Sequence, residues 1–149
     1  MGINDKNLEF IYDKNLSSKI MLLLKPEIES MFDDVIDDAR VNLAKNESVK
    51  TQTLTSSLSQ KVIIRKPTNK YKYASMNAYV GVNVNYDNLV NDNLKTPANY
   101  ALLVEFGGEA KNRNDKGSRY IPPKPFFRPA LAGIDKKITK AIKSISKKI

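Results

Sequence analysis

The chain has 149 residues and a net charge of +9, from 25 basic and 16 acidic side chains. It contains no cysteine and no histidine, which excludes disulfides, thiolate metal sites and nucleophilic catalysis assisted by histidine. Its length and its hydrophobic fraction of 41% are typical of one globular domain, and no apolar run approaches the roughly 18 residues of a membrane span. We therefore expect a single domain that is not an enzyme, with no cofactor, no metal site and no membrane contact.

The charge is unevenly distributed along the chain. Residues 1–108 have 13 acidic and 13 basic side chains, whereas residues 109–149 have 12 basic and 3 acidic ones and carry the whole net charge. Seven acidic side chains lie between Glu27 and Glu47, against two basic ones. Two interpretations stay open: these are two solvated helix faces, or they are surfaces for electrostatic contact with a partner or another copy.

The N-terminal part of the chain is expected to be helical over residues 15–46. Residues 7–12, which precede it, alternate well enough for a short strand. Pro26 suits either the first turn of a second helix or a kink in one long helix. Beyond Pro26, apolar residues recur at three- and four-residue spacing and predict one buried stripe. The stripe consists of Ile28, Met31, Phe32, Val35, Ile36, Ala39 and Leu43.

The middle of the chain, residues 60–106, is expected to contain the sheet. Residues 62–65 are mostly β-branched, and residues 78–84 alternate between the two faces of a half-buried antiparallel strand. The apolar segment 98–106 is too short for its periodicity to distinguish helix from strand. The resulting fold class is α+β, with N-terminal helices, an antiparallel sheet of about four strands and a C-terminal amphipathic helix packed on it.

A polar connection and a basic helix complete the chain. Residues 107–125 have five basic side chains, two acidic ones and three glycines, so this segment cannot bury enough apolar surface to order itself. We expect a mobile loop that becomes ordered against an adjacent subunit; a solvated loop without a partner is the alternative. Residues 128–149 are expected to form the amphipathic helix. Its apolar positions are Leu131, Ile134, Ile138, Ile142, Ile145 and Ile149.

Two short motifs flank the loop. The first, residues 100–107, has large apolar side chains around Glu105, and the second, residues 125–131, has two phenylalanines and two prolines around Arg128. If the motifs are adjacent, a bidentate ion pair between Glu105 and Arg128 would hold the two ends of the loop together. The residues expected to have structural or interface roles are Tyr100, Glu105, Phe106, Gly107, Phe126, Arg128 and Pro129. The candidates for contacts made by the loop are Lys111, Arg113, Lys116, Arg119 and Tyr120.

Together the two motifs resemble those of siphophage neck and tail-completion proteins of the lambdoid gene 10-like type. That family shows a tyrosine-alanine pair, then a glutamate-phenylalanine-glycine sequence, then a proline-phenylalanine-arginine-proline-alanine box that enters a C-terminal helix. The resemblance covers about residues 98–131, and elsewhere only the order of the elements matches. This chain departs from the family in having Gly107-Gly108 where Gly-Thr is frequent, and in its longer and more basic loop.

The resemblance implies a structural virion protein of a tailed bacteriophage. Members of the family look like ring-forming subunits, commonly hexameric, between the head-closure or adaptor ring and the tail-tube or tail-terminator protein. DNA would then pass through the lumen without sequence-specific binding. Such a protein is made in the cytoplasm of the host bacterium and ends in the neck or tail of the virion. A ring needs two different contact surfaces on each subunit, and an acidic and a basic helix offer two.

The alternative is a small basic module that binds nucleic acid. The basic C-terminal third could neutralise phosphates. However, the stacking aromatics of single-strand binders are sparse there, and no helix-turn-helix pattern is visible.

Overall fold

The computed structural model describes residues 14–46, 51–82, 97–111 and 117–149. The elements in chain order are helices α2 (Lys14–Lys45) and α3 (Thr51–Ser57), strands β1 (Leu58–Arg65) and β2 (Ser75–Val82), helix α4 (Pro97–Phe106), strands β3 (Gly108–Lys111) and β4 (Ser118–Ile121), and helices α5 (Phe127–Leu131) and α6 (Ile134–Ser146). The expected α+β class is therefore correct. The strand expected at residues 7–12 lies outside the described residues.

Helix α2 is the central element of the fold. It runs unbroken through Pro26, so of the two alternatives for this proline the structure shows one long helix. The predicted apolar stripe is confirmed, because its members are buried except for Met31, which is half-buried. Residues three and four apart share one face of a helix, so a stripe of this spacing buries one side of α2 and leaves the opposite side to solvent.

The described residues contain four strands, as expected, but the strands form two separate sheets, so the prediction of a single sheet is wrong. Strands β1 and β2 pair antiparallel from Leu58↔Val82 to Arg65↔Ser75. Within the described residues, strands β3 and β4 pair only with each other. The segment between the two sheets, which the sequence placed at the end of the sheet region, is helix α4.

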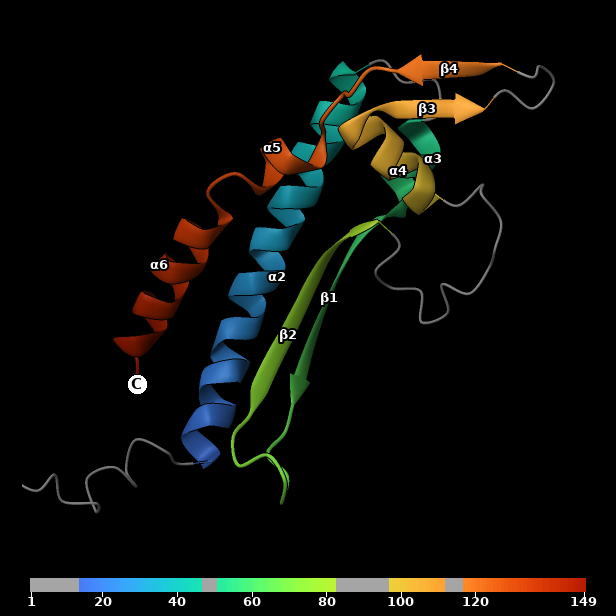
Figure 1. The fold of residues 1–149 in the computed structure, drawn as a ribbon. Coiled ribbons are helices and arrows are strands. Elements are labelled where there is room, and N and C mark those ends of the chain that lie inside the picture. Colours follow the sequence, from blue (N-terminus) through green and yellow to red (C-terminus); the bar gives the residue numbers. More distant parts are fainter. Residues whose placement is uncertain (1–13, 47–50, 83–96, 112–116) are drawn as a thin grey trace, which may run out of the picture.

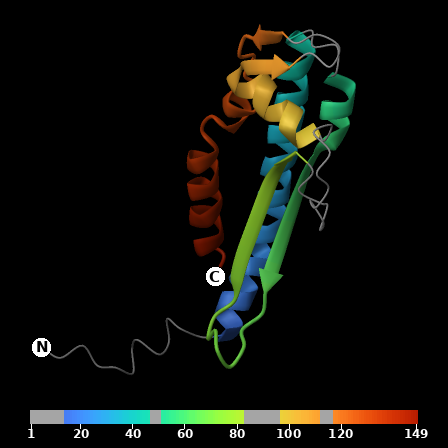
Figure 2. The same cartoon turned by 45° about the vertical axis from the view of Figure 1, so that its right-hand side comes forward.

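The body of the protein has three layers. Figure 1 shows α2 between α6 on one side and the β1–β2 hairpin on the other. The hairpin packs on α2 through the face that carries Leu58, which is buried, and Val80 and Val82, which pack against the core. Gln60 lies on the same face, and its side-chain amide donates to the Glu29 carbonyl oxygen at 3.3 Å. Figure 2 gives the same arrangement from another direction.

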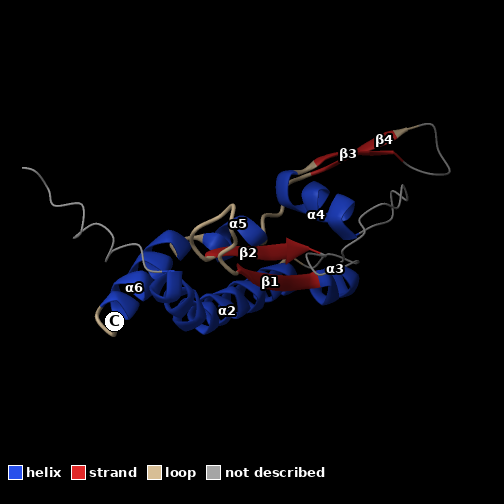
Figure 3. Ribbon diagram, turned by 90° about the horizontal axis from the view of Figure 1, so that it is seen from below, coloured by secondary structure: helices blue, strands red, loops and turns tan. Residues whose placement is uncertain are grey.

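The core lies where the C-terminal half of α2 meets the short helices. Its buried members are Val35, Ile36, Ala39, Leu43, Leu54, Leu58, Ala101, Val104, Phe126 and Ala130. The β3–β4 hairpin extends away from this end of the molecule (Figures 1 and 3). The segment 107–125, expected to be a loop, therefore contains two short strands.

The C-terminal helix, expected over residues 128–149, is interrupted. Helix α5 ends before a turn at Gly133, whose φ of +78° lies in the left-handed region that favours glycine, and α6 begins at the next residue. The predicted isoleucine stripe is buried only in part. Ile145 and Ala141 are buried, whereas Ile142 is 51% exposed. The helix was expected to pack on the sheet, but it packs on α2, and it does so through a narrower face than the predicted stripe.

Candidate functional site

The best-defined polar site in the structure surrounds the carboxylate of Glu105, in the last turn of α4. The Glu105 side chain is only 7% exposed. Its Oε2 accepts the backbone N–H groups of Phe126 at 2.8 Å and Phe127 at 2.9 Å, and its Oε1 accepts the N–H of Arg128 at 3.0 Å. These are N–H groups at the start of α5, which have no partner within the helix. Glu105 therefore caps α5 from a different element, in place of a local N-cap side chain.

Arg128 completes this arrangement, which we call the Glu105 junction: Glu105, Arg128 and the backbone N–H groups of residues 126–128. The Arg128 Nε donates to Glu105 Oε1 at 2.9 Å, and its Nη2 donates to the Glu105 carbonyl oxygen at 3.3 Å. The predicted ion pair therefore forms, but it is not bidentate on the carboxylate. The reason is that the second carboxylate oxygen already accepts the N–H groups of Phe126 and Phe127.

The environment of Glu105 keeps its carboxylate ionised. Burial by itself raises the pKa of Glu105, because it disfavours the charged form. The hydrogen bonds from the backbone of Phe127, Phe126 and Arg128 and from the Arg128 side chain outweigh this effect, and the pKa of Glu105 falls below its ordinary value. A carboxylate used in this way holds structure together and has no free lone pair directed to a substrate.

The junction is also attached to the end of α2, through contacts that sequence reasoning missed. The side-chain amide of Asn42 donates to the Phe126 carbonyl oxygen at 3.0 Å, and that of Asn46 donates to the Lys124 carbonyl oxygen at 3.1 Å. In return, the ammonium group of Lys124 donates to the Asn46 carbonyl oxygen at 2.9 Å. The spacing of four residues, which places both asparagines on one face of α2, is the signal that could have indicated a shared partner.

Gly107 fixes the place where the β3–β4 hairpin leaves the junction. Its φ is +70°, and its N–H donates to the Leu103 carbonyl oxygen at 2.9 Å, closing the end of α4. A Cβ at this position would lie 2.8 Å from both the Ile121 carbonyl oxygen and the Pro123 nitrogen. The position therefore requires glycine both for its backbone angle and for the close approach of the returning strand.

The other residues of the two motifs divide between core and surface. Phe126 is 1% exposed and lies in the core, and Tyr100 is half-buried and packs against the same cluster. Pro129 is exposed in the first turn of α5. Phe106, expected to help hold the motifs together, is instead 58% exposed, and the guanidinium of Arg128 lies 4.8 Å from the centroid of its ring. Phe106 thus covers the outer side of the junction.

The candidate loop residues lie on or next to the projecting hairpin. Arg119 and Tyr120 are on β4 and are exposed, Tyr120 to 63%. Lys111 is the last residue of β3. Arg113 and Lys116 lie outside the described residues.

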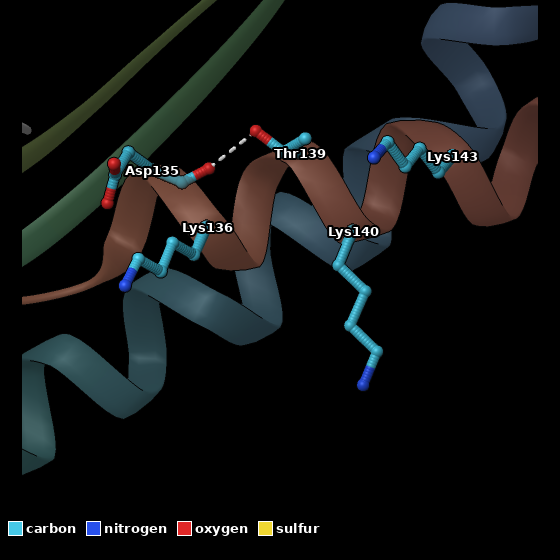
Figure 4. A pocket seen from close by; sticks show the side chains of 5 residues that line it. All are labelled: Asp135, Lys136, Thr139, Lys140 and Lys143. Carbon is cyan, nitrogen blue, oxygen red and sulfur yellow. Dashed lines mark hydrogen bonds between the residues drawn. The ribbon is translucent and has the colours of Figure 1, made fainter.

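The surface of α6 has a shallow depression of about 340 Å³, lined by Asp135, Lys136, Thr139, Lys140 and Lys143 (Figure 4). All five residues come from one helix and are exposed, and the hydrogen bond within the group runs from the Thr139 hydroxyl to the Asp135 carbonyl oxygen at 2.8 Å. A small-molecule site normally encloses its ligand with convergent polar groups from several elements. This depression is a solvated helix face.

Within the described residues, no three acidic side chains lie close enough to hold a metal ion, and no helix of that part is long and apolar enough to cross a membrane. Comparison of the chain with known protein families, with curated proteins and with solved structures finds no match.

Proposed function

We propose that this protein is a non-enzymatic structural subunit of a tailed bacteriophage virion. It would form a homo-oligomeric ring, commonly hexameric in the family that it resembles, in the neck or at the tail-completion position. The observation that carries the proposal is the Glu105 junction, because the two motifs behind the resemblance meet there through five hydrogen bonds. Motifs separated by about twenty residues are thus used as one structural unit.

The β3–β4 hairpin supports a role in assembly. An isolated two-stranded hairpin is at best marginally stable in water, and no other strand in the part of the chain that the structure describes pairs with these two. The hairpin is nevertheless mounted on a buried, multiply hydrogen-bonded base, and it presents Arg119 and Tyr120 to solvent. We assign it a contact with the adjacent subunit or with a neighbouring ring, either the head-closure ring or the tail-tube or tail-terminator ring. DNA would pass the ring without sequence-specific contacts.

Hydrogen exchange tests this role of the hairpin. The amides of residues 118–121 should exchange fast in the free subunit and become protected in the assembled neck or tail. The amides of α2 that face the core provide the control, because they should be protected in both states. Equal exchange of the hairpin in the two states would remove it from the interface.

A basic nucleic-acid-binding module is the second candidate, and the exposed lysines of α6 favour it. Duplex DNA binding measured over a range of salt, together with native mass, separates the two proposals. A DNA binder loses affinity steeply as salt rises and stays a small oligomer. A ring subunit shows weak DNA affinity and a large or assembly-dependent mass.

A further inference from the structure

Three acidic residues form a row on the open face of α2. Glu27, Asp34 and Asp38, which we call the acidic row, are exposed and lie together on one flank of the solvent side of the helix. Elsewhere on α2, Glu29 pairs with Lys25 at 3.5 Å and Asp37 with Arg40 at 3.0 Å. Within the described residues no ion pair involves the acidic row. The row is therefore a strip of uncompensated negative charge.

Helix α6 and its C-cap residue, Lys147, carry a row of the opposite sign. Lys136, Lys140, Lys143 and Lys147, which we call the lysine row, are exposed and share one face at intervals of four, three and four residues. In the described part of the chain none of them forms an ion pair. Figure 4 shows three of them extending from α6 without a hydrogen bond to the other side chains drawn.

The two rows match in spacing. The acidic row has intervals of seven and four residues, and Lys136, Lys143 and Lys147 have the same intervals. Read in the opposite direction, Lys147, Lys140 and Lys136 also lie seven and four residues apart. Since a helix rises about 1.5 Å per residue, each acid can meet one lysine over a length of about 16 Å, whichever way the helices run.

No ion pair joins the two rows within one copy, as far as the described residues show. Helix α6 lies along α2, with Ala141 and Ile145 buried and with the lysine row on an exposed face. The acidic row lies on the exposed side of α2, and among the residues that the structure describes none of its members pairs with a lysine of the row on α6. Each row therefore remains available to another molecule, and the complementary charges indicate which one.

We infer that the lysine row of one copy docks on the acidic row of a second copy. This inference names the contact surfaces of the proposed ring and rests on the proposal that the chain assembles with itself. The contact is heterologous, since two different surfaces meet, and contacts of this kind close into rings or continue as filaments. Val41 follows Asp38 on the same face and is 50% exposed, so it offers apolar surface to the lysine stems.

Two charge-reversal variants test the contact. The first replaces Lys136, Lys140 and Lys143 by glutamate, which leaves Lys147 as the one positive charge of that row and makes both rows acidic in net charge. The second replaces Glu27, Asp34 and Asp38 by lysine, which makes both rows basic. Each variant alone should lose at least about tenfold in self-association, because like charges then face each other. An equimolar mixture should associate again, because each lysine-bearing face then meets an acidic one, and this association should weaken between about 0.05 and 0.5 M salt.

A matched control carries the same change of charge elsewhere. Replacing the exposed residues Lys66, Lys70 and Lys72 by glutamate changes the net charge as the first variant does, but at the far end of the β1–β2 hairpin. Circular dichroism confirms that all variants fold, and sedimentation velocity with a fluorescence titration measures association. The control should associate as the unchanged protein does.

The outcomes separate this inference from the proposed function. Variants that self-associate like the unchanged protein, or a mixture that stays dissociated, would overturn the inference, and a ring that persists in them would leave the proposed function standing with a different interface. If the two variants associate with each other but the unchanged protein never forms a closed ring, the contact stands and the ring proposal fails. If the first variant, in which lysines are replaced by glutamate, loses only DNA binding, and the mixture shows no association, then the lysine row is a nucleic-acid surface and the inference is wrong.

Discussion

The Glu105→Gln substitution isolates the charge of the junction while keeping the size and shape of the side chain. The carboxylate accepts four N–H donors, three from the backbone and one from Arg128. Glutamine keeps one accepting oxygen and turns an NH₂ group toward the remaining donors. If its oxygen takes the place of Oε2, the N–H and the Nε of Arg128 lose their acceptor and face another donor.

The magnitude follows from the number and the burial of these bonds. A hydrogen bond to a charged group contributes about 1.5–3 kcal/mol, so losing two gives an upper value of about 6 kcal/mol. The Arg128 side chain is 58% exposed, so water can replace its lost bond and that part is small. We therefore expect Glu105→Gln to lower the free energy of unfolding by about 3 kcal/mol, a large part of the 5–15 kcal/mol typical of a domain.

Urea unfolding followed by circular dichroism measures this change, and Arg128→Ala is the matched control. Removing the arginine takes away one exposed ion-pair partner but leaves the three backbone N–H groups bonded to the carboxylate. It should cost about 1 kcal/mol or less. If Arg128→Ala destabilised the protein as much as Glu105→Gln, the ion pair and not the capping of α5 would hold the junction, and the reasoning would be refuted.

The remaining predictions concern pH, packing and backbone. The pKa of Glu105 in the folded protein lies below its ordinary value of 4.5, so the ionised carboxylate stabilises the fold above pH 4.5. This stabilisation is lost as the pH falls through the folded pKa. Acid unfolding of Glu105→Gln should therefore lack the loss of stability that Glu105 contributes. Phe126→Ala should lower the free energy of unfolding by about 3–5 kcal/mol in urea titrations, since the ring is 1% exposed, and a loss under about 1 kcal/mol would contradict its place in the core. Gly107→Ala should cost clearly more than Gly133→Ala in the same assay. Both glycines have a positive φ, but of the two only Gly107 would bring a Cβ against backbone atoms. Gly133→Ala should therefore cost only the roughly 1–2 kcal/mol of left-handed strain. Equal losses for the two variants would contradict the close approach of the backbone at Gly107.

The sequence predicts α2 well because its periodicity reports burial directly. Apolar residues at three- and four-residue spacing share one face only on a helix, and Ile28, Phe32 and Leu43 on that face are indeed buried. The strand alternation at residues 78–84 likewise predicts β2. It gives the face of a strand but not its neighbour, so it cannot tell one sheet of four strands from two sheets of two.

Helix α4 shows why the exposed position of Phe106 was not predicted. In a strand, Val104 and Phe106 would lie on the same face, since side chains alternate with a period of two. In the helix, Ala101, Val104 and Glu105 form the buried face, and Phe106 shares the opposite face with Leu102, which is 62% exposed. The segment is apolar on nearly all sides, so its pattern favours neither the two-residue period of a strand nor the 3.6-residue period of a helix.

The contact between Glu105 and Arg128 could be predicted because opposite charges in two flanking motifs suggest it. Most of the hydrogen bonds to Glu105 could not be predicted, because their donors are backbone N–H groups that every residue except proline carries. The same holds for Asn42 and Asn46, whose partners are carbonyl oxygens of residues 126 and 124. Side-chain identity indicates which elements attract each other, whereas backbone partners depend on the path of the chain.

The junction and the acidic row occupy different parts of α2, and this separation has a consequence for assembly. Asn42 and Asn46, at the C-terminal end of the helix, hold the junction and with it the β3–β4 hairpin, whereas Glu27, Asp34 and Asp38 precede them along the open face. Stability and association therefore depend on different residues of one rigid element, and effects at sites without shared partners usually add. Combining Glu105→Gln with the reversal of the acidic row should lower unfolding stability no further than Glu105→Gln alone, while association falls as it does for the row variant. A further loss of stability in the combined variant would mean that the row supports the fold, and the contact between copies would then need another surface.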